Sequence, residues 1–183
     1  MRCHRGCRMD LQPVQMETAD LQQYCYHVAG AVGLCCLRIW EVDASQAQPL
    51  AIDCGLAFQL TNILRDLKED SIAGRIYLPR EDLERFHYES EDLLAARRNV
   101  HFTELMRFEV SRAREYYRSA SRLSPYLSAE TRPVLGTMLR IYSGLLDKIE
   151  HRRFDVFSER VRLSTWYKFR TVATEIVRAR FSL

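Results

Sequence analysis

The stretch that decides the fold is Ala57-Phe58-Gln59-Leu60-Thr61-Asn62-Ile63-Leu64-Arg65-Asp66-Leu67-Lys68-Glu69-Asp70, followed shortly by Gly74-Arg75-Ile76-Tyr77-Leu78-Pro79. At helical pitch, about 100° per residue, the first part separates into two neighbouring stripes. The apolar stripe holds Leu60, Ile63, Leu64 and Leu67. The polar stripe holds only amides and carboxylates, namely Gln59, Asn62, Asp66, Glu69 and Asp70. On this wheel Arg65 and Lys68 point away from both stripes, so no cation on the helix neutralises the acids.

The polar stripe has the chemistry of a divalent-cation site. Asp66 and Asp70 are one turn apart, and like charges at this spacing repel each other. If the stripe faces inward, its carboxylates are costly unless a cation neutralises them. Mg²⁺ takes a few hard oxygens from protein and completes its shell with water and phosphate. An ordinary solvated acidic turn explains the same spacing equally well.

The same stretch resembles the second aspartate-rich motif of the squalene and phytoene synthase family. Two upstream segments resemble family signatures and occur in the family's order: Gly6-Cys7-Arg8-Met9-Asp10-Leu11 and Tyr24-Cys25-Tyr26-His27-Val28-Ala29-Gly30-Ala31-Val32-Gly33. Asp155-Val156-Phe157 and Arg162-Leu163-Ser164 also fit, so the resemblance covers essentially the whole chain. It implies an all-α helical bundle of the class I isoprenoid (terpenoid) synthase type.

The family joins two allylic prenyl diphosphates head to head. Within it, Val32-Gly33-Leu34-Cys35-Cys36-Leu37-Arg38-Ile39-Trp40 is most similar to the bacterial branch that makes presqualene diphosphate and squalene. The main interpretation is therefore a prenyltransferase that condenses two farnesyl diphosphates in isoprenoid biosynthesis. The alternatives are a phytoene-type synthase and a non-catalytic protein that binds a prenyl diphosphate.

The resemblance also implies roles for particular residues. It implies Mg²⁺ ligation by Asn62, Asp66 and Asp70. It implies catalytic roles for Tyr24, Asp66 and Asp70, with the tyrosine moving a proton or stabilising a cation. It implies substrate contacts near the diphosphates for Gln59, Arg65, Tyr142 and Arg160. By themselves Tyr24 and Tyr142 lie on apolar faces and would be core residues. The sequence does not indicate NADPH.

Composition and periodicity predict one helical domain over residues 1–183, with residues 1–19 irregular. The chain has 47% hydrophobic and 28% charged residues, which is typical of globular proteins, and its net charge of +3 is too small to indicate nucleic acid. Apolar periodicity predicts helices over 20–40, 49–71, 80–86, 93–98, 103–124, 131–149 and 164–180. The last helix is basic and amphipathic, so it either packs on the bundle or lies weakly on a membrane surface.

Six cysteines occur without a secretory leader pattern, so reduced thiols are expected rather than a disulfide framework. Four of them lie in apolar helical patterns, where burial is expected. Cys3-His4-x-x-Cys7 has no second ligand pair and only weakly suggests metal. The longest uncharged apolar run, 28–37, is too short to span a bilayer. We expect a cytoplasmic protein with weak association at the inner membrane surface.

Family members carry a first aspartate-rich motif, two Asp separated by three residues, ahead of these segments. The acids before Tyr24 here are Asp10, Glu17 and Asp20, which cannot form that motif. We therefore expect the chain to match the C-terminal two-thirds of a family enzyme, with half of the metal site. Such a bundle would expose part of its core face, which predicts oligomerisation or poor solubility.

Overall fold

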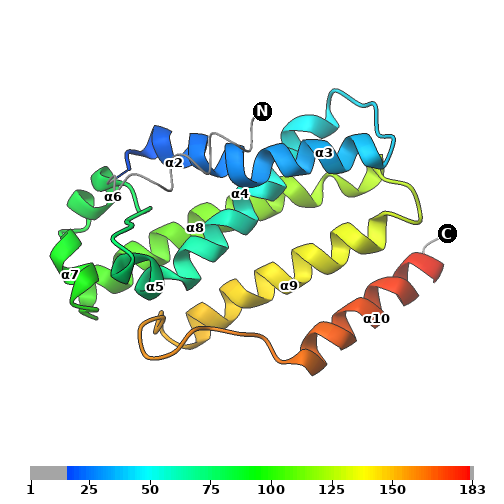
Figure 1. The fold of residues 1–183 in the computed structure, drawn as a ribbon. Coiled ribbons are helices and arrows are strands. Elements are labelled where there is room, and N and C mark those ends of the chain that lie inside the picture. Colours follow the sequence, from blue (N-terminus) through cyan, green and yellow to red (C-terminus); the bar gives the residue numbers. More distant parts are fainter. Residues whose placement is uncertain (1–15, 182–183) are drawn as a thin grey trace.

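Every regular element in the described residues, 16–181 of this computed structural model, is helical, so the all-α prediction is confirmed. The predictions for residues 1–15, including the 6–11 segment and the Cys3-His4-x-x-Cys7 motif, lie outside them. The elements, labelled as in Figure 1, are α2 (Thr18–Cys25), η1 (Tyr26–Gly30), α3 (Ala31–Ile39), α4 (Ala47–Arg65), α5 (Leu67–Ile72), α6 (Arg80–Arg85), α7 (Ser90–Leu94), α8 (Val100–Ser121), η2 (Ser124–Tyr126), α9 (Arg132–His151) and α10 (Thr165–Phe181).

The helices pack around α4 (Figure 1). Helix α8 lies along α4, and α2, η1 and α3 form one continuous helical rod that also packs on α4. Helix α9 contacts both α4 and α8, whereas α10 packs on α9 at the edge of the bundle. The short helices α5, α6 and α7 gather at the opposite end from the C-terminus. The arrangement places the motif, on the last part of α4 and on α5, toward that same end of the bundle.

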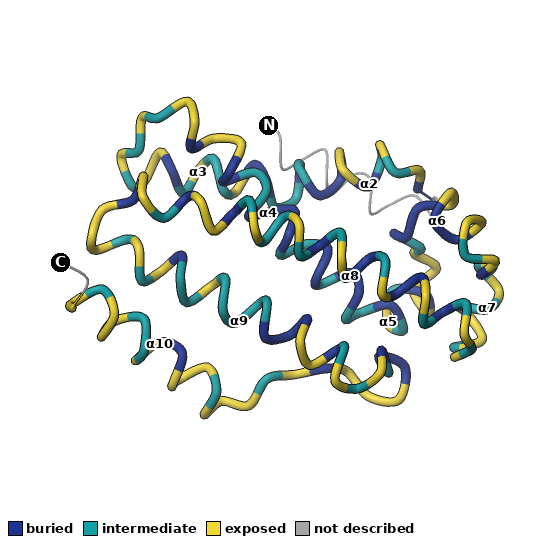
Figure 2. Tube along the Cα trace, turned by 180° about the vertical axis from the view of Figure 1, so that it is seen from behind, coloured by how far each residue is buried: buried dark blue, intermediate teal, exposed yellow. Residues whose placement is uncertain are grey.

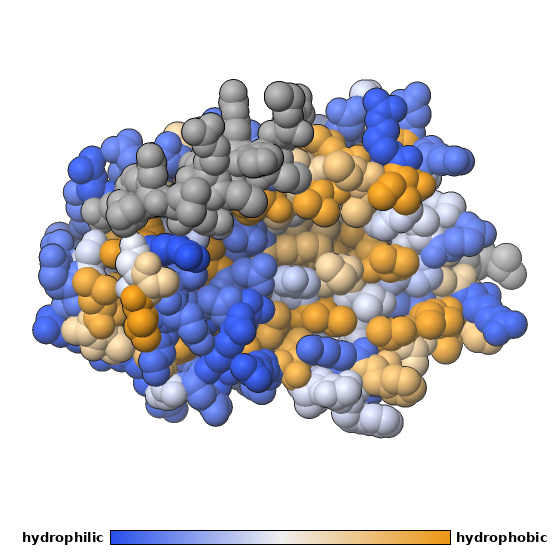
Figure 3. Space-filling model, in the orientation of Figure 1, coloured by the Kyte–Doolittle hydropathy of each residue, from blue (hydrophilic) through white to orange (hydrophobic). Residues whose placement is uncertain are grey.

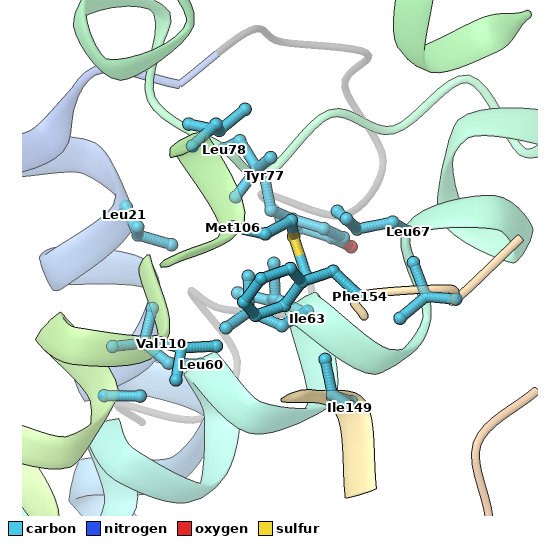
Figure 4. Packing of buried hydrophobic residues seen from close by; sticks show 14 of the residues in the cluster. Leu21, Leu60, Ile63, Leu67, Tyr77, Leu78, Met106, Val110, Ile149 and Phe154 are labelled. Carbon is cyan, nitrogen blue, oxygen red and sulfur yellow. The ribbon is translucent and has the colours of Figure 1, made fainter. Parts of the chain in front are cut away.

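The apolar stripe of the motif is part of the main core. Leu60, Ile63, Leu64 and Leu67 are all buried, as predicted. Figure 4 shows Leu60, Ile63 and Leu67 meeting Met106 of α8 and Phe154, which follows α9. Burying each such side chain stabilises the fold by roughly 1.5–3 kcal/mol. The stripe therefore couples the motif helix to α8 and to the segment that follows α9.

The prediction of one uninterrupted motif helix over 49–71 is wrong. Helix α4 ends at Arg65 and α5 begins at Leu67, because Asp66 leaves helical geometry with φ −103° and ψ 15°. The hydrogen bonds continue on either side, from the Asp66 amide to the Asn62 carbonyl and from the Asp70 amide to the Asp66 carbonyl, both at 2.9 Å. Aspartate is a poor residue for a helix interior. The result is a local bend at the central acid of the motif.

The predicted helix over 20–40 contains a π-helical turn at Tyr26–Gly30. Such turns insert an extra residue into a helix and are frequent at functional sites. Beyond the turn α3 packs very closely on α4, since a β-carbon on Gly33 would lie 2.4 Å from the Ala51 carbonyl oxygen. A β-carbon on Gly55 would lie 2.5 Å from the Ala29 carbonyl carbon. The absence of a side chain at Gly33 and Gly55 therefore permits this close packing of the two helices.

Helix α10 packs on α9, which confirms the bundle interpretation of the last predicted helix. Its outer face is exposed along most of its length (Figure 2). The exposed apolar side chains are Trp166, Phe169, Val172, Ile176, Val177 and Phe181. None of the helices within residues 16–181 is both long enough and apolar enough to cross a bilayer.

Four cysteines lie in the described residues, and all four are free thiols. Cys25 and Cys54 are buried, and burial raises the pKa of each to about 12. Cys36 is partly buried, and burial raises its pKa as well. Cys35 is exposed, so the expectation of burial is wrong there because its side of α3 faces solvent.

A buried charge cluster joins α6 to α8. The Glu109 side chain is fully buried, and Arg112 donates to both its carboxylate oxygens at 3.0 Å and to Asp82 at 2.7 Å. Burial raises the pKa of Glu109, the Arg112 guanidinium opposes this, and Asp82 raises the pKa again. Two acids share one guanidinium, so a proton retained on Glu109 makes the cluster neutral.

Folding stability is expected to fall as the pH rises from the ordinary Glu109 pKa of 4.5 to its folded value of about 8. The unfolded chain releases this proton at lower pH than the folded chain, so deprotonation favours unfolding across that window. Glu109→Gln removes this titrating group. The loss of unfolding free energy across this pH window is therefore expected to be smaller in the variant by about 1 kcal/mol or more. Urea unfolding at several pH values measures it, with the exposed Glu104→Gln on the same helix as the control. Equal slopes in both variants would contradict this assignment.

Candidate functional site

Asp66 is held between two arginines. Arg65 donates from Nε to Oδ1 at 2.7 Å and from Nη2 to Oδ2 at 2.5 Å. Arg160 approaches the same two oxygens with Nε at 2.8 Å and Nη2 at 2.9 Å. Bidentate guanidinium–carboxylate pairs are strong and directional. The prediction that Arg65 points away from the acids is wrong, because the bend at Asp66 turns the preceding side chain onto it.

The paired arginines keep Asp66 ionised. Burial alone raises the pKa of this carboxyl, but the hydrogen bonds and charges of Arg65 and Arg160 outweigh burial and hold it below its ordinary value. The hydrogen bond to Asp66 in turn raises the pKa of Arg160, and the charges of Glu69 and Asp70 act in the same direction. Arg160 therefore lies in the field of three acids from the polar stripe.

The chain after α9 brings Arg160 to this position from 94 residues away. Phe154, Val156, Phe157 and Val161 are buried, so this segment is anchored in the core. Phe157 packs on Phe102 of α8 with ring centroids 5.0 Å apart. Lys68 of the motif also donates to the Phe157 carbonyl at 2.6 Å. The segment is thus fixed by α8 through Phe102 and by the motif through Lys68, and this positions Arg160 next to Asp66.

An apolar cavity of about 350 Å³ opens beside the same motif. Its walls come from α3, α4 and α9, and Gln59 and Asn62 line it together with Tyr142. The Tyr142 ring stacks on Phe58 with centroids 4.4 Å apart. Figure 3 shows apolar side chains gathered over the region between α3 and α9. Val32, Val134 and Met138 line the cavity and are also exposed large apolar residues, in keeping with the expected exposed core face.

Six of the eight predicted site residues fall into two groups. Arg65, Asp66 and Arg160 form one cluster, and Gln59, Asn62 and Tyr142 line the cavity. The two groups adjoin through the backbone hydrogen bond from Asp66 to Asn62. Asp70 lies one turn further along on α5. The structure thus brings six of the predicted residues to the C-terminal half of α4.

Tyr24 lies apart from that cluster, in the main core. Its side chain is buried, and its ring stacks on Tyr77 with centroids 4.9 Å apart. Tyr77 comes from the loop after Gly74, whose φ of 72° suits glycine. The catalytic role of Tyr24 stays a prediction.

The oxygen ligands of the motif suit Mg²⁺ in kind. Mg²⁺ accepts carboxylate and amide oxygens and keeps several waters, so Asn62, Asp66 and Asp70 would form a partial set. Within residues 16–181, no group of three or more His, Cys, Asp or Glu side chains is arranged to hold a metal ion. Asp66 also already accepts four guanidinium hydrogen bonds. A cation that binds here has to share this carboxylate with the arginines.

Sequence reasoning missed most of the cavity wall. Phe58, Leu123 and Met138 line the cavity, yet their apolar periodicity only indicates burial. They come from three separate segments that meet only in the folded chain. Phe58 alone carried a local signal, since it directly precedes Gln59 in the motif.

The chain is similar to known proteins of one family. The family model for squalene/phytoene synthase matches residues 1–167. The phytoene synthase of Arthrospira platensis is 41% identical over 189 aligned positions, which cover 96% of this chain and 61% of that protein. The 15-cis-phytoene synthase of Synechocystis sp. is 42% identical, with 87% of this chain and 51% of that protein covered.

Among solved structures, a dehydrosqualene synthase in complex with ligand superposes with a TM-score of 0.89 at 29% identity, covering 98% of this chain and 64% of that chain. A squalene synthase from Alicyclobacillus acidocaldarius superposes with a TM-score of 0.80 at 26% identity, covering 84% of this chain and 59% of that chain. The chain thus spans half to two-thirds of the length of these relatives. The matched family model and the shared helical fold lead to one conclusion: the chain belongs to the squalene/phytoene synthase family.

Proposed function

We propose that this chain supplies the second aspartate-rich half of a prenyltransferase site that joins two prenyl diphosphates head to head. The observation that carries the proposal is that the apolar cavity reaches Asn62, one helical turn before Asp66 and its two arginines. Asn62 lines the cavity, and its carbonyl accepts the backbone hydrogen bond from Asp66. An isoprenoid tail in the cavity would therefore place its diphosphate beside Asp66 and the two arginines.

The phytoene-type alternative has better support than the farnesyl-to-squalene interpretation. Curated relatives above 40% identity are named phytoene synthases. The likeness of residues 32–40 to the squalene branch rests on a single short segment. We therefore propose a phytoene-type reaction and leave the chain length of the donor to experiment.

The described residues would supply part of the chemistry that such a reaction requires. Negative charge develops on the departing diphosphate, and Arg65 and Arg160 are placed to donate hydrogen bonds to it. Mg²⁺, when bound through Asn62, Asp66 and Asp70, would supply further electrostatic stabilisation of that charge. The aromatic rings of Phe58 and Tyr142 would stabilise an allylic cation that lies beside them in the apolar cavity.

A second candidate is a protein that binds a prenyl diphosphate without catalysis. The observation that favours it is that Arg65 and Arg160 already pair with the Asp66 carboxylate, which neutralises this acid without a metal ion. Binding without turnover is the signature of this candidate.

Two measurements on the 183-residue chain distinguish the candidates. Radiolabelled farnesyl or geranylgeranyl diphosphate with Mg²⁺ tests turnover, and calorimetry with the corresponding thiolodiphosphates tests binding. We expect Mg²⁺-dependent binding in about the 1 μM–1 mM range typical of enzyme substrates. Product from the longer donor supports the phytoene-type reaction, whereas binding alone supports the non-catalytic candidate. Absence of both binding and turnover would contradict the proposal.

The exposed face of α10 supports the predicted weak membrane association. Large apolar side chains lie there beside Lys168, Arg170, Arg178 and Arg180, a composition typical of surface-seeking helices. The exposed Val32, Val134 and Met138 at the cavity support the predicted oligomer through an exposed core face. Sedimentation with anionic vesicles tests the membrane association, and light scattering tests the oligomer.

A further inference from the structure

The apolar cavity has a polar end and an apolar end. Gln59 and Asn62 mark the polar end on α4, and Ala51 lines the cavity further back along the same helix. At 1.5 Å rise per residue, Asn62 and Ala51 are roughly 16 Å apart along the helix axis. The close contacts of Gly33 with Ala51 and of Gly55 with Ala29 show that α3 runs antiparallel to α4. Following α3 toward its C-terminus therefore leads away from the diphosphate end.

Trp40 lies at this far end. It is the C-terminal cap of α3 and lines the cavity together with Leu37, Leu123 and Leu135. Leu37, Leu123 and Leu135 are buried in the second core cluster, which is separate from the core around Ile63, and the partly buried Trp40 packs against this cluster. Backbone hydrogen bonds of 2.9 Å from Trp40 to the Cys36 carbonyl and from Val42 to the Leu37 carbonyl hold the turn. The largest side chain on the cavity wall is thus anchored where an extended tail would end.

We propose that Trp40 sets the longest prenyl chain that this cavity accepts. The inference rests on the proposed function, because it takes the occupant to be a prenyl chain whose diphosphate lies near Asn62. A tail that grows by one isoprene unit at its far end meets the indole before it meets any other lining side chain of that size. The indole has more non-hydrogen atoms than an isoprene unit, so its removal leaves room for one further unit.

The test compares a ligand series in the wild-type chain and in Trp40→Ala. The probes are geranyl, farnesyl, geranylgeranyl and geranylfarnesyl thiolodiphosphates, measured by calorimetry with Mg²⁺. In the wild type, affinity is expected to rise with chain length up to a limit and then to fall. In Trp40→Ala the limit is expected to move one isoprene unit longer, with about a 10-fold or greater gain for the first chain beyond the wild-type limit.

The second tryptophan of the chain provides a matched control. Trp166 on α10 is 71% exposed and does not line this cavity, so Trp166→Ala is expected to keep the wild-type limit. Trp40→Phe retains a smaller aromatic ring at the same position. It is expected to raise the affinity for the first chain beyond the wild-type limit by a smaller factor than Trp40→Ala does. This variant also tests the proposal if Trp40→Ala does not fold.

The outcomes separate the inference from the proposed function. If wild-type chain binds the series and both Trp40 variants keep the wild-type limit, the assignment of Trp40 is wrong while the proposed function stands. If wild-type chain binds no member of the series, both fail. If Trp166→Ala shifts the limit as much as Trp40→Ala does, the effect does not come from the far end of the cavity, and the inference is again overturned.

Discussion

Replacing Asp66 with alanine is expected to abolish the Mg²⁺-dependent part of diphosphate binding. Asp66 is the central oxygen ligand of the predicted set, and the pKa lowered by Arg65 and Arg160 keeps it ionised at neutral pH. Its removal leaves two adjacent guanidiniums without their shared carboxylate. Metal-free binding of an anion is therefore expected to persist or to strengthen, because guanidinium pairs favour phosphate groups.

Calorimetry with inorganic pyrophosphate, with and without MgCl₂, measures both effects. We expect the Mg²⁺-dependent gain in affinity to fall at least about 100-fold in Asp66→Ala, comparable to the loss of one strong electrostatic contact in an active site. Asp66→Asn keeps the side-chain shape and separates loss of charge from loss of volume. Glu115→Ala is the control, since this acid pairs with Arg118 on the exposed side of α8 and such pairs contribute little.

Two results would count against this assignment. An unchanged Mg²⁺ dependence in Asp66→Ala would show that the carboxylate only neutralises the arginines. A loss of metal-free pyrophosphate binding in the same variant would show that Asp66 positions the arginines rather than the metal.

Phe102→Ala is expected to lower the free energy of unfolding by about 3–5 kcal/mol. The Phe102 side chain is 0% exposed, and its ring packs on Phe157 at 5.0 Å and on Tyr88 at 5.4 Å between centroids. Truncation leaves a cavity between α8 and the segment that carries Arg160. Native proteins typically have a free energy of unfolding of about 5–15 kcal/mol, so this substitution alone would remove a large part of it.

Urea unfolding of wild type, Phe102→Ala and Val100→Ala measures the effect. Val100 lies two positions earlier on α8 but is 63% exposed, so its truncation should change stability by no more than about 0.5 kcal/mol. A loss below about 1 kcal/mol in Phe102→Ala would mean that this part of the core collapses around the gap. The Arg160 segment would then not depend on the ring for its position.

The helical architecture was predictable because its signal is local. Apolar residues at helical spacing predicted α4, α8, α9 and α10. The burial of Leu60, Ile63, Leu64 and Leu67 followed from the same periodicity. The predicted helix boundaries are wrong where the local backbone departs from α-helical geometry. Asp66 interrupts the motif helix, and the π-helical turn at Tyr26–Gly30 inserts a residue without changing the apolar pattern.

The sequence by itself determined the helices, the buried stripe and the family. Each of these follows from short patterns of residues that are close along the chain. Only the tertiary structure decided that Arg160 pairs with Asp66 across 94 residues and that Arg65 turns onto the same carboxylate. It also decided that α3, α4 and α9 enclose a cavity that runs from Asn62 to Trp40. Periodicity reports which face of a helix is buried, whereas the partner of that face depends on how distant segments pack, and this is where the site is assembled.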